Sequence, residues 1–390
     1  MRCIYCDRDS KYKDRESGHC PSCHKPFAFE PRRGAPITDV AFKRAIDAVS
    51  ADGHVRWGVE HLYYDVCRRI ARARHRKPQL RIIFGALTVI VLGAVVKGVW
   101  SVAIAFGVAW IVIGIMAFKP RRRTVPLSRK DFDDMWARWQ QVHPDRPKGM
   151  IVRQPPKPRT RPVEADVPLY SFDRAVICDR ARTVDLLLAN NFHFENNCAV
   201  LSIEGYPPGP FGTVRTMLKR NPRLQVFALH DATPAGCRLA HRLATDPEWF
   251  AGQAHVVDVG LRPAQARGFR GVLLPAHRTP VEPGQGIDVS EAKWLSVYAL
   301  ELAAIRPEQV LKRLYRAVNK RATPDGDGGS AEGGGGSSGS RDAAVASMAA
   351  HEGAFGGAGA QSGWGDGVSV DSDSFSSDAG DADGDGDGSG

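Results

Sequence analysis

The chain has 390 residues and a formal net charge of +10, but that charge is unevenly distributed. The last 69 residues, 322–390, contain 13 acidic residues, one arginine and half of the 40 glycines, so the remainder carries a net charge of +22. A hydrophobic content of 43% excludes wholesale disorder, and the length allows two or three domains. We expect 322–390 to be a disordered acidic tail, because Gly, Ser and Asp cannot bury enough apolar surface to offset chain entropy.

Four cysteines near the N-terminus form two Cys-x-x-Cys pairs, Cys3 with Cys6 and Cys20 with Cys23, separated by thirteen residues. Each pair can bind one tetrahedral ion from a tight turn, and four thiolates leave no position open for substrate. The spacing predicts a zinc ribbon over residues 1–30 with a structural Zn²⁺. The alternative is a redox dithiol pair. A reduced tetrathiolate favours a cytosolic location.

Residues 80–118 are predicted to form a two-helix transmembrane hairpin. From Ile82 to Phe118 the only charged residue is Lys97. One helix of that length would be about 55 Å long, whereas the hydrocarbon core of a bilayer is about 30 Å thick. A break at Lys97 and Gly98 gives two spans, the first of them short. The alternative is a pair of buried core helices.

Basic residues on both sides of the hairpin predict its orientation. Arginine and lysine are concentrated at 68–81 and again at 119–123. The positive-inside rule then places both termini in the cytoplasm of a multi-pass protein of the cell membrane, with the lipid bilayer as a partner. Much of the positive charge is thereby explained as a membrane-surface signature.

Three further segments surround the hairpin. Residues 37–78 are helical, with Thr38 as an N-cap, and could form either a winged-helix-like unit or a helical stalk. Residues 127–143 form an amphipathic helix that Ser128 caps. Residues 144–168 are rich in proline and basic residues and are predicted to be an extended linker.

Residues 169–321 are predicted to form an α/β domain. Four short apolar runs, at 175–178, 199–203, 224–229 and 255–259, alternate with helical segments at 184–189, 214–219 and 236–243. This alternation is typical of a parallel sheet with helices on both faces. In such sheets the functional residues follow the carboxyl ends of the strands.

Two carboxylates follow two of these strands, Asp179 after the first and Asp231 after the third. They could converge to hold Mg²⁺, which prefers carboxylate oxygens. The alternative is that both are helix caps, since each precedes a helix. His193 and His230 could act as an acid or base, or could be hydrogen-bonded parts of the structure.

Several motifs of this domain resemble a known family. These motifs are Gly205-Tyr206-Pro207, Thr213-x-Arg215-x-x-Leu218, the run from Phe227 to Gly236, and Val259 to Gln265. They look like the Toprim domain of topoisomerase VI A subunits and of the related meiotic double-strand-break transesterase, over about 175–318. The resemblance implies a Toprim-like parallel sheet in which a Glu and an Asp-x-Asp pair hold Mg²⁺ while a tyrosine attacks DNA.

The chain departs from that family at two of the three metal positions. Asp179 stands in the place of the Glu, and Thr233 in the place of the second Asp. The loss of one carboxylate should weaken Mg²⁺ binding markedly. Tyr64, in the sequence Glu60-His-Leu-Tyr-Tyr, is similar to the nucleophile of the family, although a tyrosine pair at helical spacing is also typical of packing.

The sequence therefore favours a membrane-anchored cytoplasmic binding or scaffold protein. Its parts would be a structural zinc ribbon and a degenerate, non-catalytic Toprim-like domain that binds nucleic acid, a nucleotide or another protein. The alternative is a Mg²⁺-dependent enzyme that cleaves phosphodiesters or transfers phosphoryl groups, with Asp179, Asp231 and Tyr64 as the catalytic candidates.

Overall fold

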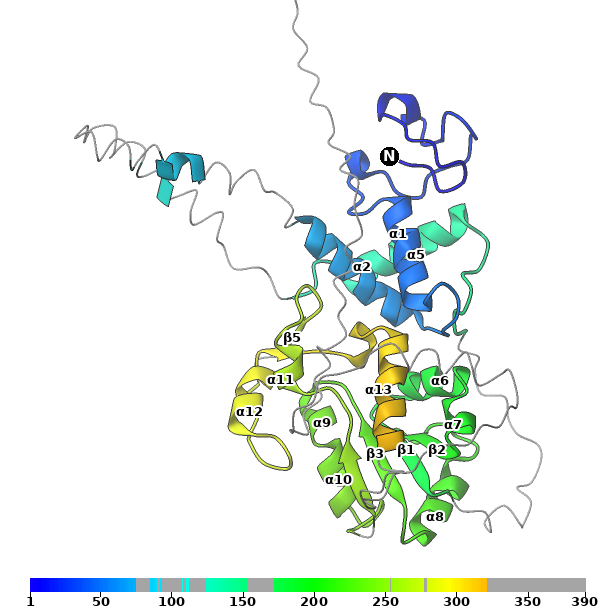
Figure 1. The fold of residues 1–390 in the computed structure, drawn as a ribbon, viewed down its shortest axis with the longest axis vertical. Coiled ribbons are helices and arrows are strands. Elements are labelled where there is room, and N and C mark those ends of the chain that lie inside the picture. The colour runs from blue at the N-terminus through cyan, green and yellow to red at the C-terminus, as the bar shows by residue number, and fades with distance from the viewer. Residues whose placement is uncertain are drawn as a thin grey trace, which may run out of the picture.

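The computed structural model describes residues 1–74, 85–89, 92, 107, 110–111, 124–152, 172–252, 254–276 and 279–320 (Figure 1). The tail at 322–390 and most of the predicted hairpin and linker lie outside the described residues. Within the described ranges, no helix is both long and apolar enough to cross a membrane.

The N-terminal segment, which contains the four predicted zinc ligands, has little regular structure. It contains two short 3₁₀ turns, η1 (Lys13–Arg15) and η2 (Pro31–Arg33). A buried ion pair joins them, with Arg15 Nε 2.7 Å from Glu30 Oε2. Because its hydrophobic cluster contains only a few side chains, two of them cysteines, the segment needs another source of stability.

Three helices form a unit beneath this segment: α1 (Asp39–Ser50), α2 (Val59–Arg74) and α5 (Arg129–Val142). Thr38 and Ser128 cap α1 and α5 as their sequences predict, each accepting a backbone N–H through its hydroxyl. The rings of Phe42 on α1 and Trp139 on α5 lie 4.8 Å apart. Helices from both sides of the predicted hairpin therefore share one core.

The α/β unit contains a four-stranded sheet of β1 (Arg174–Cys178), β2 (Cys198–Ser202), β3 (Gln225–Leu229) and β4 (His255–Asp258). All neighbours are parallel, in the order β2-β1-β3-β4. This confirms the predicted parallel α/β sheet. The strand order reverses between β1 and β3, which is the point at which such sheets place their functional sites.

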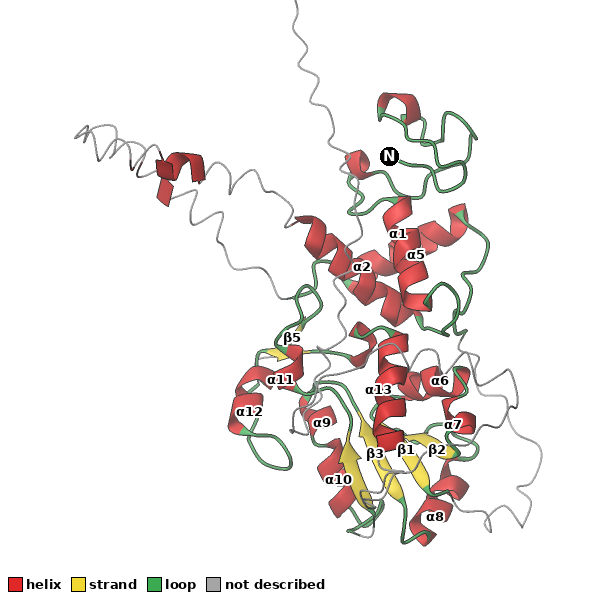
Figure 2. Ribbon diagram, in the orientation of Figure 1, coloured by secondary structure: helices red, strands yellow, loops and turns green. Residues whose placement is uncertain are grey.

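Helices cover both faces of this sheet (Figure 2). Alternate strand residues divide into two cores: Ile177 and Ala228 lie in one and Val176 and Phe227 in the other. The first core includes α8 (Phe211–Arg220) and α10 (Leu239–Thr245), and the second includes α6 (Ala181–Ala189) and α13 (Pro307–Lys320). The remaining elements are α7 (Phe192–Glu195), α9 (Pro234–Cys237), α11 (Pro263–Ala266), β5 (Leu274–Pro275), α12 (Val289–Leu295), β6 (Tyr298–Ala299) and η4 (Leu302–Ala304).

The three-helix unit is joined to the α/β unit by specific polar contacts. Asp65 on α2 is 2% exposed and lies 3.7 Å from Arg306. Arg68 on the same helix donates to the carbonyl oxygen of Ala304. The backbone of Val125 donates to Leu273 O at 3.0 Å. The first two contacts place α2 beside η4 and the start of α13.

Candidate functional site

The four predicted zinc ligands converge. The sulfurs of Cys3, Cys6, Cys20 and Cys23 all lie within 4.8 Å of one another. The Cys3–Cys23 and Cys6–Cys20 separations are 3.7 and 3.6 Å. Four sulfurs bound tetrahedrally to zinc at about 2.3 Å would be about 3.8 Å apart, so the cluster is compatible with a Zn²⁺ site.

The two cysteine pairs have the same backbone design. Cys3 N donates to Arg8 O at 3.0 Å, and Cys20 N donates to Lys25 O at 2.9 Å. The residue after each pair, Asp7 or His24, has a positive φ that closes the turn. The chain thus builds two equivalent turns, each presenting two sulfurs to the same point.

The surroundings favour thiolate at one position and thiol at another. Backbone N–H groups of Cys23 and Ser22 lower the pKa of Cys20 to about 6. Burial raises the pKa of Cys3 to about 12. A bound Zn²⁺ would deprotonate a ligating thiol outright, so the site fits the ion chemically as well as in shape.

The cysteine segment is fixed to the helices through a chain of three polar side chains. The hydroxyl of Tyr5, which lies between two of the ligands, is 2.6 Å from His143 Nδ1. His143 Nε2 is 3.6 Å from a carboxylate oxygen of Asp39. Asp39 in turn accepts the backbone N–H groups of Ala28 and Phe29.

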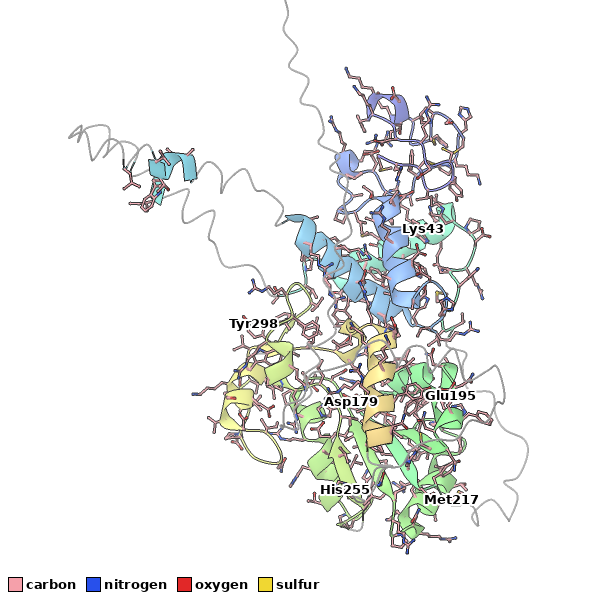
Figure 3. The ribbon with its side chains drawn as sticks, in the orientation of Figure 1. Lys43, Asp179, Glu195, Met217, His255 and Tyr298 are labelled. Carbon is pink, nitrogen blue, oxygen red and sulfur yellow. The ribbon has the colours of Figure 1, made fainter. Side chains whose placement is uncertain are left out.

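The two aspartates at the carboxyl end of the sheet, Asp179 and Asp231, lie next to each other. Cys178 pairs with Leu229 in the parallel register, so the residues that follow each strand are adjacent. The backbone N–H of Asp231 donates to Asp179 Oδ2 at 2.8 Å. In Figure 3, Asp179 lies at the end of the sheet that faces the three-helix unit, and His255, at the start of β4, lies at the opposite end.

Two arginines lie close to one carboxylate oxygen of Asp231. Its Oδ1 accepts the backbone N–H of Leu302 at 2.6 Å. Its Oδ2 lies 3.5 Å from Arg180 Nε and 3.5 Å from Arg182 Nη2. Arg182 also pairs with Glu301 at 3.0 Å. Both oxygens of Asp231 thus already interact with the protein.

The carboxylate of Asp179 differs from that of Asp231 in its partners. Its Oδ1 is buried and has no hydrogen-bond partner among the described residues. Burial, and then the nearby Asp231 carboxylate, raise the pKa of Asp179 to about 7. Thr233, at the position of the second Asp of the family, caps α9, where its hydroxyl accepts Gly236 N at 3.0 Å.

Tyr64 lies in the same polar network. It is 1% exposed on α2, and its hydroxyl lies near enough to the Glu301 carboxylate to interact with it. Burial, and then that carboxylate, raise the pKa of Tyr64 far above the usual value of 10. The fold therefore brings Tyr64 toward the sheet edge through Glu301 and Arg182, but in a setting that disfavours the phenolate.

His230 is part of the structure beneath this edge. It is fully buried, and its ring nitrogens lie 2.8 Å from Asp231 O and 2.9 Å from Asp258 Oδ1. Burial lowers its pKa, but the Asp258 hydrogen bond outweighs this and the net shift is upward. Burial is likewise outweighed at Asp258, where the bond from His230 leaves a pKa of about 2. His193 lies on α7, which precedes β2 and is therefore at the other end of the sheet.

We expect Asp258→Asn to destabilise the protein by about 2 kcal/mol at pH 6, because a hydrogen bond to a buried imidazolium loses its charge. The raised pKa of His230 gives stability that is complete below its unfolded pKa near 6.5 and is lost as pH rises through the folded value. The lowered pKa of Asp258 gives stability that is lost as pH falls from 3.8 through about 2. The deficit of the variant should therefore shrink toward pH 9.

Denaturant unfolding followed by tryptophan fluorescence measures this effect. Asp133→Asn, in an exposed ion pair on α5, is the matched control. A deficit that does not change between pH 6 and pH 9 would contradict the charged state of His230.

The residues that sequence reasoning missed are Arg180, Arg182 and Glu301. Arg180 directly follows Asp179 and Arg182 comes two residues later, so their position after a strand was a usable signal. Glu301 comes from a loop far along the chain, and nothing in the sequence pointed to it. No family model, no curated protein and no solved structure matches the chain.

Proposed function

We propose that this protein is a membrane-anchored cytoplasmic nucleic-acid-binding protein with a structural zinc ribbon and a degenerate, non-catalytic Toprim-like domain. One observation carries the non-catalytic part: Arg180 and Arg182 lie against the oxygen of Asp231 that a metal would need. In the family that the sequence resembles, three carboxylates surround Mg²⁺. Here two aspartates remain at those positions, and the two guanidinium groups beside Asp231 would repel a divalent cation from its Oδ2.

The same arginines support phosphate binding. The side chain of Arg180 is 47% exposed at the carboxyl end of β1, and its other ion pair, with Glu204, is an exposed contact of 3.6 Å. Surface ion pairs of this kind are weak and exchange easily for a phosphate oxygen. Arg180 can therefore contact a nucleic-acid backbone.

The membrane anchor rests on the hydropathy of 80–118 and on its basic flanks. One contact within the described part supports a hairpin. Trp110 Nε1 donates to Thr88 Oγ1 at 2.7 Å, and these residues belong to the two different predicted spans. Both termini would then lie on the cytoplasmic side.

We expect the full-length protein to bind short duplex DNA with an affinity that falls steeply with salt, and to leave the DNA uncut in Mg²⁺ or Mn²⁺. Arg180→Ala should weaken binding and reduce the slope of log affinity against log salt by about 1. Fluorescence anisotropy at several salt concentrations measures both. Arg220→Ala, an exposed arginine at the end of α8 on the other side of the sheet, should change neither.

Two results would overturn this proposal. One is the absence of DNA binding at low salt. The other is DNA cleavage that depends on Mg²⁺ and is lost in Asp231→Ala while the fold is kept.

A second candidate function is the Mg²⁺-dependent enzyme, with Asp179 and Asp231 as its ligands. It is favoured by the buried Oδ1 of Asp179, which has no hydrogen-bond partner among the described residues and is the kind of oxygen that a hard cation completes. Its test is the cleavage assay above.

A further inference from the structure

A cavity of about 230 Å³ lies between the start of α2 and the first half of α6. Arg182 lines this cavity, whereas Asp179 and Asp231 do not. Ligand sites for drug-sized molecules are commonly about 300–1,000 Å³. At about 230 Å³ the cavity is smaller than these sites, so it is too small for a dinucleotide and limits a ligand to about one nucleoside.

The cavity is lined by polar groups whose hydrogen-bonding capacity is not fully used by the described residues. His61 is 9% exposed, its Nδ1 lies 3.2 Å from Gly58 N, and its Nε2 makes no hydrogen bond with the described residues. Arg182 uses only Nη2 in its ion pairs, so its Nε and Nη1 remain open within the described part of the chain. The Thr183 hydroxyl and the Glu60 carboxylate likewise lack a side-chain partner there, and both residues line the cavity.

The charges favour a neutral ligand. Two carboxylates and one guanidinium group line the cavity, those of Glu60, Asp185 and Arg182. Asp185 accepts the Tyr206 hydroxyl, and Arg182 pairs with Asp231 and Glu301. Burial lowers the pKa of His61 to about 4, so it adds no positive charge. A phosphate would meet more negative than positive charge here.

The remaining walls are aliphatic, formed by Ile151, Leu186 and Leu302. Such walls can pack against the face of a flat ring, while polar groups on one side form hydrogen bonds with the edge of the ring. Glu60 and Arg182 both line the cavity, so a hydrogen-bond acceptor and a donor are available to the same ligand. Among the bases, guanine has two neighbouring N–H donors beside a carbonyl acceptor on one edge.

We propose that this cavity binds a neutral guanine nucleoside, with Glu60 accepting the N1–H and N2–H of the base and Arg182 donating to O6. His61 and Thr183 are left for the sugar hydroxyls. The site goes beyond the proposed function and does not depend on DNA binding at the sheet edge. It also gives the Glu60-His61 part of the tyrosine motif a role that is not catalytic.

Calorimetric titration of the full-length protein with guanosine, adenosine and guanosine monophosphate tests the proposal. Guanosine should bind, adenosine should bind at least about tenfold more weakly, and the monophosphate should bind no more tightly than guanosine. Glu60→Gln should weaken guanosine binding by about tenfold or more. Glu248→Gln, an exposed residue after α10, should leave it unchanged.

Ala303→Met is a second variant, which fills the cavity without altering a polar group, and it should abolish binding. Both variants are compared with wild type by thermal unfolding to verify that they fold. No binding of guanosine, equal binding of adenosine, tighter binding of the monophosphate, or an unchanged Glu60→Gln would each overturn the proposal. A failure of DNA binding would leave it untouched.

Discussion

Removal of zinc is expected to unfold residues 1–34 while the α/β unit stays folded. The binding free energy of a structural Zn²⁺ in a short segment is of the order of 10–16 kcal/mol, and that energy is the folding energy of the segment. The hydrophobic cluster around Cys3, Cys20 and Phe27 is too small to replace it. Strong chelation should therefore open the arginines and lysines of this segment to trypsin.

Elemental analysis and limited proteolysis measure this result. The intact protein should contain one zinc per chain, and Cys6→Ser should lose it. Cys67→Ser is the matched control, because Cys67 is a buried cysteine on α2 outside the cluster. A chain that carries no zinc, and whose first 34 residues resist trypsin after chelation, would contradict a structural metal.

The zinc cluster was predictable because its information is local. Two Cys-x-x-Cys pairs state the ligand number and the ion, and each turn is closed within a few residues. How this segment attaches to the rest was not predictable. The contact between Tyr5 and His143 spans 138 positions, and no periodicity or spacing in the sequence points to it.

The sheet was predictable for a similar reason. The apolar run of β2 is buried along its whole length, which is why it can be recognised without alternation. Helix bounds were less accurate. The predicted helix at 236–243 is two helices in the structure, α9 and α10, because the chain turns at Arg238. The short helix α7 was missed, since four residues carry no usable periodicity.

The convergence of Asp179 and Asp231 followed from the rule for carboxyl ends of parallel strands. The contacts and the pKa of each carboxylate did not follow from that rule. They depend on Arg182, on Glu301 and on the backbone of Leu302, and the last two come from a segment about 70 residues further along the chain. Chemistry at this edge is therefore decided by contacts that a linear motif does not contain.

Replacing Asp179 with asparagine is expected to stabilise the protein at pH 8. A carboxylate whose folded pKa is raised contributes stability only below its unfolded pKa of 3.8, and that contribution is lost as pH rises through about 7. The stability that the wild type loses in this way corresponds to about 4 kcal/mol when Asp179 is fully ionised. Asparagine is never charged, and its side-chain oxygen can still accept the Asp231 N–H, so the gain should be near zero at pH 4 and full above pH 8.

Denaturant unfolding at several pH values, with EDTA and then with Mg²⁺, measures this gain. Asp52→Asn, at an exposed turn after α1, is the control and should change little. The Mg²⁺ arm separates the two functions considered for this edge. If Asp179 and Asp231 hold the ion, Mg²⁺ should stabilise the wild type and the asparagine variant should lose that effect. If arginines have taken the place of the metal, as we propose, Mg²⁺ should change neither protein, and the asparagine variant should be the more stable of the two at pH 8.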